Sequence, residues 1–151
     1  MVCVMATGVF DIIHLGHLHY LEESKKLGDE LVVVVATDKT VRRRKHEPIT
    51  PEKMRLELVA SLKPVDRAVL GKDSGDMFEI VRDIRPDIIT IGYDQPFNPD
   101  QLQAELKKRG LNAKVVRMPH LDADLDGTRK IIAKVIEFHE VNRKLSEVEQ
   151  R

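Results

Sequence analysis

Two histidines, His14 and His17, follow closely on an apolar segment near the start of the chain. They stand in the run Thr7-Gly8-Val9-Phe10-Asp11-Ile12-Ile13-His14-Leu15-Gly16-His17, just before a segment expected to be helical. Glycines let a backbone approach a ligand, and free N–H groups at a helix start attract anions. Imidazole donors can bind phosphate oxygens and stabilise charge that develops in a transition state. The run therefore predicts a phosphate-binding turn.

The histidines also have other interpretations. An isolated histidine is commonly a structural hydrogen-bonding residue, and His14, His17 and His19 together could hold a metal ion. No nearby cysteine or fixed carboxylate completes such a metal site. Phosphate binding by His14 and His17 is therefore preferred, and His19 is expected on a helix surface.

The same run resembles the G-x-F-D-x-x-H-x-G-H signature of the cytidylyltransferase-like nucleotidyltransferases. The resemblance covers nearly the whole chain, including residues 27–34, 41–45, 51–55, 64–66, 86–89 and the start of the last expected helix. Within that superfamily, Gly92-Tyr93-Asp94-Gln95 and the following Phe97 favour the archaeal-type FAD synthases over the glycerol-phosphate cytidylyltransferases.

This resemblance implies transfer of a nucleotidyl group from a nucleoside triphosphate to a phosphorylated acceptor, with pyrophosphate as the leaving group. Such chemistry needs alignment and charge stabilisation rather than a protein nucleophile. The leading hypothesis is transfer of AMP from ATP to FMN, with Mg²⁺ held by the nucleotide phosphates. The alternative is a CTP-dependent cytidylyltransferase acting on glycerol phosphate or a similar small phosphorylated alcohol. A nucleotide-binding regulatory module without catalysis is a third hypothesis.

The resemblance also implies roles for residues of the turn. His14 and His17 would bind the α- and β-phosphates and stabilise the transition state, while Asp11 would orient a donor or a hydrated magnesium ion. The alternative for Asp11 is a carboxylate that caps the turn. The expected nucleotide-binding residues are Thr7, Gly8, Val9, Phe10, His14, His17, Asp94, Thr128 and Arg129.

A basic run, residues 42–45, follows the second expected strand and is interpreted as a flexible loop that meets the acceptor phosphate, or as a solvated face. Arg44 and Lys45 are the expected acceptor ligands. Arg55 matches an active-site arginine of the family, with a helix-surface charge as the alternative. Tyr93 and Phe97 offer apolar faces to a ring, or pack under their loop.

The segment Asp126-Gly127-Thr128-Arg129 opens the last expected helix. The family carries a serine- and threonine-rich segment here, ending in a basic residue that holds the triphosphate. Thr128 and Arg129 match it, whereas Asp126 and Gly127 replace the usual serines. An extra carboxylate beside phosphates calls for magnesium to offset its charge. A plain helix cap is the alternative interpretation.

The elements that position these residues are indicated by short Val- and Ile-rich runs alternating with amphipathic segments. Strands are expected at 2–6, 31–36, 67–70, 87–91 and 114–118, and helices at 16–27, 51–62, 75–84, 98–110 and 128–144. The alternation predicts an α/β, Rossmann-like three-layer sandwich with a five-stranded parallel sheet and ligands at the carboxyl ends of the strands. Residues 1–144 form the expected nucleotidyltransferase domain, and 145–151 a polar tail that frays.

Composition limits the classes of partner. The chain has 151 residues, with 25 basic and 25 acidic side chains, so its net charge attracts neither nucleic acid nor an anionic membrane. Its one cysteine cannot form an internal disulfide, and its longest apolar run is far shorter than a membrane span. The expected partners are small-molecule substrates, the expected location is cytoplasmic, and the resemblance favours a homodimer.

Overall fold

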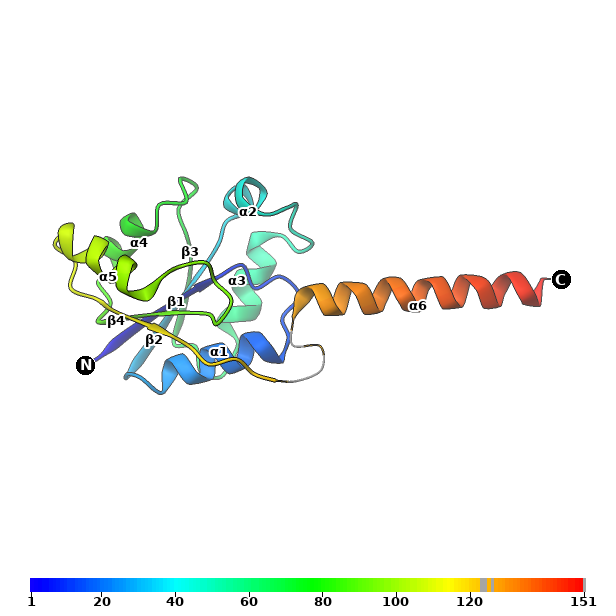
Figure 1. Cartoon of the computed structure of the whole chain (residues 1–151), viewed down its shortest axis with the longest axis horizontal. Coiled ribbons are helices and arrows are strands. Elements are labelled where there is room, and N and C mark those ends of the chain that lie inside the picture. The colour runs from blue at the N-terminus through cyan, green and yellow to red at the C-terminus, as the bar shows by residue number, and fades with distance from the viewer. Residues whose placement is uncertain (123–124, 126, 151) are drawn as a thin grey trace.

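The computed structural model describes residues 1–122, 125 and 127–150. Strands and helices alternate along most of this part of the chain (Figure 1). In chain order they are β1 (Cys3–Gly8), α1 (Leu15–Lys25), β2 (Glu30–Val35), α2 (Asp38–Arg44), α3 (Glu52–Ala60), β3 (Arg67–Leu70), α4 (Met77–Ile84), β4 (Ile88–Ile91), α5 (Pro99–Lys108), β5 (Lys114–Arg117) and α6 (Thr128–Glu149). Each of the expected strands is present, with its ends close to those expected.

The strands form one parallel sheet in the order β3-β2-β1-β4-β5. In β2 every residue after Glu30 is buried, as a strand covered on both faces requires. The order reverses at β1, because β2 lies on one side of it and β4 on the other. In sheets of this type ligands bind at the carboxyl ends of the strands beside that reversal. The predicted fold class is confirmed.

Helices cover both faces of the sheet. Successive residues of β1 point to opposite faces, so Met5 belongs to one apolar cluster and Val4 to another. The first cluster includes Ile80 of α4 and Leu106 of α5. The second includes Leu21 of α1 and Val59 of α3. This gives the three layers that the sequence predicts.

The prediction of a flexible loop over the basic run is wrong. Residues 42–44 lie in α2, and Lys45 is its C-cap. The hydroxyl of Thr37 accepts a hydrogen bond from the N–H of Thr40 and so caps the start of this helix. A capping threonine followed by Asp38 is a signal for a helix start, but the four cations mask it.

The last helix also differs from the prediction. It continues to Glu149, so residues 145–149 are helical rather than frayed. Near this end of α6, Arg143 forms ion pairs with Glu140 at 3.1 Å and Glu147 at 3.4 Å. The helix extends away from the rest of the protein, and none of its residues is buried (Figure 1). None of the described helices is both long and apolar enough to span a membrane.

Candidate active site

The two predicted catalytic histidines lie at the junction of the loop after β1 with α1, and each ring accepts a hydrogen bond from a backbone N–H there. Nδ1 of His14 accepts from the N–H of Gly16 at 3.0 Å, and Nδ1 of His17 accepts from the N–H of His14 at 3.3 Å. The two rings stack with their centroids 3.8 Å apart. These bonds satisfy N–H groups at the start of α1, as a capping box does. Both imidazoles are thereby held at the carboxyl end of β1.

The backbone of this loop is strained. Phe10 and Ile12 have φ values of 57° and 52°, a region that a β-branched residue occupies only where its surroundings enforce it. A Cβ on Gly8 would lie 2.9 Å from the Phe10 ring, so only glycine fits there. That ring is buried, with its centroid 5.4 Å from the ring of His17. Phe10 therefore supports the loop with its side chain and can offer a nucleotide only its backbone.

His17 is neutral at pH 7. Its pKa is lowered to about 3, chiefly by burial and also by the neighbouring His14 and Lys45, while Asp11 opposes the shift. Because Nδ1 of each ring accepts a hydrogen bond, the hydrogen-bond pattern assigns the proton of both rings to Nε2. The loop thus presents neutral imidazole donors rather than fixed positive charge.

Asp11 closes the loop onto the segment before α3. One carboxylate oxygen accepts from the N–H of Ile49 at 2.7 Å, and the other from the N–H and hydroxyl of Thr50 at 3.0 and 2.6 Å. Burial raises the pKa of Asp11, but these hydrogen bonds and the charge of Arg55 outweigh it and bring the pKa below its usual value. This geometry shows the turn-capping role, and the orientation of a donor or a hydrated magnesium ion by Asp11 stays a prediction.

Arg55, in α3, is completely buried. Its guanidinium donates to the carbonyls of Thr50, Val9 and Ala36 at 3.0, 2.8 and 2.7 Å, and to the carboxylate of Asp38 at 2.7 Å. The helix-surface alternative is therefore wrong. Direct binding of an acceptor is also corrected, because the side chain has no exposed surface and its donors are engaged by the protein. Arg55 instead joins the segments that follow β1 and β2 to the start of α3.

The four cations after β2, residues 42–45, have different partners. Arg42 forms an ion pair with Glu47 at 2.8 Å, and Arg43 donates to two carbonyls of the loop before α4. Arg44 donates to another carbonyl of that loop at 2.5 Å. Lys45 has no ion-pair partner among the described residues. Arg44 and Lys45, the two expected acceptor ligands, line a cavity that Arg42 and Arg43 do not reach.

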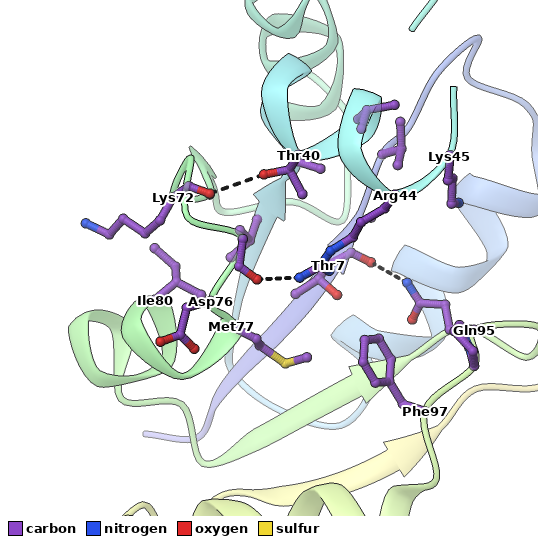
Figure 2. A pocket seen from close by; sticks show the side chains of 18 residues that line it. Thr7, Thr40, Arg44, Lys45, Lys72, Asp76, Met77, Ile80, Gln95 and Phe97 are labelled. Atoms are coloured by element: carbon purple, nitrogen blue, oxygen red, sulfur yellow. Dashed lines mark hydrogen bonds between the residues drawn. The ribbon is translucent and has the colours of Figure 1, made fainter. Parts of the chain in front are cut away.

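That cavity has a volume of about 280 Å³ and lies at the carboxyl edge of the sheet (Figure 2). Apolar side chains form much of its wall: Val34, Val41, Met77, Ile80, Pro96 and Phe97. Three cationic residues also line it: Arg44, Lys45 and Lys72. Thr7, Gly8 and Val9 complete one side, so the cavity adjoins the start of the histidine loop. An apolar space with a cationic border suits a planar ring that carries a phosphate.

Two side chains, Gln95 and Arg117, hold the turn after β4. Gln95 accepts from the N–H of Gly92 at 2.7 Å and donates to the carbonyl of Thr7 at 3.3 Å. Arg117, in β5, donates to four carbonyls of residues 92–97. No local motif signals Arg117, because its partners lie 20 to 25 positions away in the chain.

The predicted ligand residues of this turn are separated. Phe97 lines the cavity and packs against the core. Tyr93 is 48% exposed, does not line the cavity and lies against His120, with ring centroids 4.0 Å apart. Asp94 is exposed beside it. The two aromatic rings therefore do not face the same space.

The start of α6 returns to the histidine loop. The hydroxyl of Thr128 donates to the carbonyl of Asp11 at 2.8 Å, joining residues 117 positions apart. Arg129 follows it and is exposed. Asp126, which the sequence analysis places in the same segment, lies outside the described residues.

The structure thus gathers most predicted residues at one edge of the sheet. His14, His17 and Thr128 surround the loop after β1, while Arg44, Lys45 and Phe97 lie around the adjoining cavity. Within the described part of the chain, no group of three His, Cys, Asp or Glu side chains is placed to hold a metal ion. The arrangement offers donors and cations for phosphates beside a space for a ring.

Comparison with known proteins defines the class. Residues 5–143 match the family model described as cytidylyltransferase-like, and the chain belongs to this family. It is 59% identical over 138 residues to the FAD synthase of Aciduliprofundum boonei, covering 91% of this chain and 92% of that protein. It is 49% identical over 151 residues to the FAD synthase of Archaeoglobus profundus, covering 99% of this chain and 95% of that protein.

Solved structures agree on the fold. A crystal structure from Thermoplasma volcanium, described as a lipopolysaccharide core biosynthesis protein, has a TM-score of 0.78 and 57% identity, covering 81% of this chain and 99% of that one. Pantothenate synthetase from Thermus thermophilus has a TM-score of 0.56 at 12% identity, covering 81% of this chain and 56% of that one. The second likeness shows the fold alone.

The lowered pKa of His17 makes stability depend on pH. The ordinary value is 6.5 and the folded value about 3, so the unfolded chain binds more protons between these limits. The free energy of unfolding should therefore fall as the pH drops from 6.5 towards 3. Above pH 6.5 the titration of His17 should not change the free energy of unfolding. Urea denaturation at about pH 7 and about pH 4.5 measures this dependence. The pH dependence of the free energy of unfolding should be shallower in His17→Asn and unchanged in His19→Asn. An equal pH dependence in the unmodified chain and both variants would contradict the lowered pKa of His17.

Proposed function

We propose that this chain transfers AMP from ATP to FMN, giving FAD and pyrophosphate. The observation that carries the proposal is the apolar cavity with cationic residues directly beside the histidine loop. FMN combines a broad planar ring with one phosphate and needs both features, whereas glycerol phosphate has no ring to place in such a cavity. The name FAD synthase, shared by relatives 49% to 59% identical over most of this chain, supports the same reaction over the CTP-dependent alternative.

The reaction is a displacement at phosphorus. A phosphate oxygen of FMN attacks the α-phosphorus of ATP, the bond to the bridging oxygen breaks, and pyrophosphate leaves with that electron pair. His14 and His17 would donate from Nε2 to oxygens of the α- and β-phosphates. Donors fixed in advance stabilise the charge that develops without reorganising during the step. The hydrogen bonds that the two rings accept from backbone N–H groups, together with their stacking, would hold these donors in place.

The nucleotide would lie over the histidine loop. Backbone groups of residues 7–10 would approach its phosphates, and Thr128 and Arg129 would hold the triphosphate from the start of α6. A cation in the first turn of a helix opposes the helix dipole, and a bound anion relieves this conflict. Asp94, exposed on the turn after β4, would accept from ribose hydroxyls or the adenine amino group.

The acceptor would occupy the cavity. Phe97 and Met77 would contact the flavin ring, while Arg44 and Lys45 would attract its phosphate. The charge of Lys45 also contributes to the lowered pKa of His17. With the flavin ring in the cavity, the adenine would bind outside it.

A divalent cation accompanies the nucleotide in this chemistry, and we propose Mg²⁺. The nucleotide phosphates would hold it, since the carboxylate of Asp11 is engaged with residues 49 and 50. When bound, the cation would neutralise phosphate charge. We further propose that the protein works in the cytoplasm as a homodimer on these small molecules, with no nucleic acid or membrane partner.

A pyrophosphate-release assay tests the reaction directly. We expect release with ATP and FMN in the presence of Mg²⁺, and FAD as the second product by chromatography. ATP with glycerol phosphate and CTP with FMN serve as the crossed controls. Release from CTP and glycerol phosphate without any from ATP and FMN would replace this proposal with the cytidylyltransferase alternative.

Flavin binding tests the cavity independently of turnover. Phe97→Ala should weaken the FMN complex by about 1 kcal/mol or more, because an aromatic wall of the ring site is lost. Quenching of flavin fluorescence measures the affinity. Phe78→Ala is the matched control, since Phe78 packs against the same core cluster but does not line the cavity. Equal weakening in both variants would place the flavin elsewhere.

The role of His17 separates binding from catalysis. In His17→Asn the side-chain oxygen can still accept from the N–H of His14, but the Nε2 donor is gone. We expect kcat to fall by about 100-fold with little change in ATP affinity, because a donor aimed at developing charge acts mainly in the transition state. His19→Asn should retain full turnover. Unchanged kcat in His17→Asn would remove His17 from the catalytic residues.

A further inference from the structure

Helix α6 carries large apolar side chains on an unpartnered surface. Its 22 residues extend about 33 Å at a rise of 1.5 Å per residue, away from the rest of the protein (Figure 1). Phe138 is 67% exposed, Val141 50%, Leu145 57% and Val148 66%. An isolated helix is only marginally stable in water, and exposed apolar surface of this kind marks an interface.

These side chains follow a seven-residue repeat. A first row consists of Ile131, Phe138 and Leu145, which stand seven positions apart. A second row begins three positions later and consists of Lys134, Val141 and Val148, also seven positions apart. Together the two rows form a seam along one side of α6, made of Ile131, Lys134, Phe138, Val141, Leu145 and Val148. This is the spacing of a two-stranded coiled coil, with Lys134 as its polar member.

We propose that a second copy of this chain covers the seam, with the two α6 helices antiparallel. A parallel pair would bring both Lys134 ammonium groups into one layer and both globular parts to the same end of the helices. In the antiparallel register, Phe138 lies opposite Val141 of the second copy and Lys134 lies opposite Leu145. The apolar side chains then meet in layers and the two lysines are kept apart.

Charges beside the seam fit the same register. Glu137 and Lys144 flank the seam on one side, each one position before a member of the first row. In the antiparallel pair, Glu137 of each copy lies beside Lys144 of the other, so two opposite-charge pairs form by symmetry. The inference names the interface of the proposed homodimer and does not depend on which reaction the enzyme catalyses.

Molecular mass in solution tests the seam. Sedimentation equilibrium of the full chain should give twice 17.2 kDa, about 34 kDa. The double variant Phe138→Lys and Val141→Lys should give 17.2 kDa, because it places four ammonium groups in the central layers. Ile136→Lys is the matched control, since Ile136 is 58% exposed on the same helix but lies off the seam, and it should remain dimeric.

Three results would overturn the proposal: a monomeric unmodified chain, a double variant that stays dimeric, or a control that dissociates as readily as the double variant. A charge exchange tests the orientation. Lys144→Glu should weaken the dimer by about tenfold, and adding Glu137→Lys should restore it. Failure of the restoration would exclude the antiparallel register. Sedimentation needs no turnover, so absence of FAD formation would count against the proposed reaction alone.

Discussion

The active-site edge depends on one buried cation. The guanidinium of Arg55 has no exposed surface, and removing a charge from water is tolerated only when its donors find acceptors. Those acceptors are the carbonyls of Val9, Ala36 and Thr50 and the carboxylate of Asp38. Loop carbonyls inside a protein need donors just as strictly. Arg55 therefore holds together the segment after β1, the segment after β2 and the start of α3. Asp11 adds hydrogen bonds to residues 49 and 50.

A division of roles follows from this framework. The residues that fix the loops, such as Asp11, Arg55 and Gln95, are engaged with the protein, while the side chains available to phosphates lie at the edge of the sheet. His17 is neutral because burial lowers its pKa to about 3. In the proposed reaction it stabilises phosphate charge as a hydrogen-bond donor, and positive charge comes from Lys45, Arg129 and the divalent cation. Neutral imidazoles avoid placing two cations in stacked rings 3.8 Å apart.

Helix α6 connects this site to the proposed assembly. The hydroxyl of its first residue, Thr128, donates to the carbonyl of Asp11, and the seam lies farther along the same helix. Pairing with a second copy would restrict the motion of the whole helix and so of the turn that holds Thr128 and Arg129. The proposed pairing would bury large side chains such as Phe138 on a helix that has no buried residue in the single chain.

The sequence by itself determined the features that depend on neighbouring residues. The apolar runs specify the strands, Asn98 caps α5 by accepting from two N–H groups as its spacing indicates, and the spacing of His14 and His17 lets each ring cap the turn of the other. Only the tertiary structure decided the roles of Asp11, Arg55 and Arg117. A carboxylate or guanidinium takes its role from the partners it meets on folding, and these partners lie far along the chain: 38 positions from Asp11, 46 from Arg55 and 25 from Arg117. The helix beyond residue 144 was predicted to fray because its residues are mostly polar, whereas the structure continues α6 to Glu149.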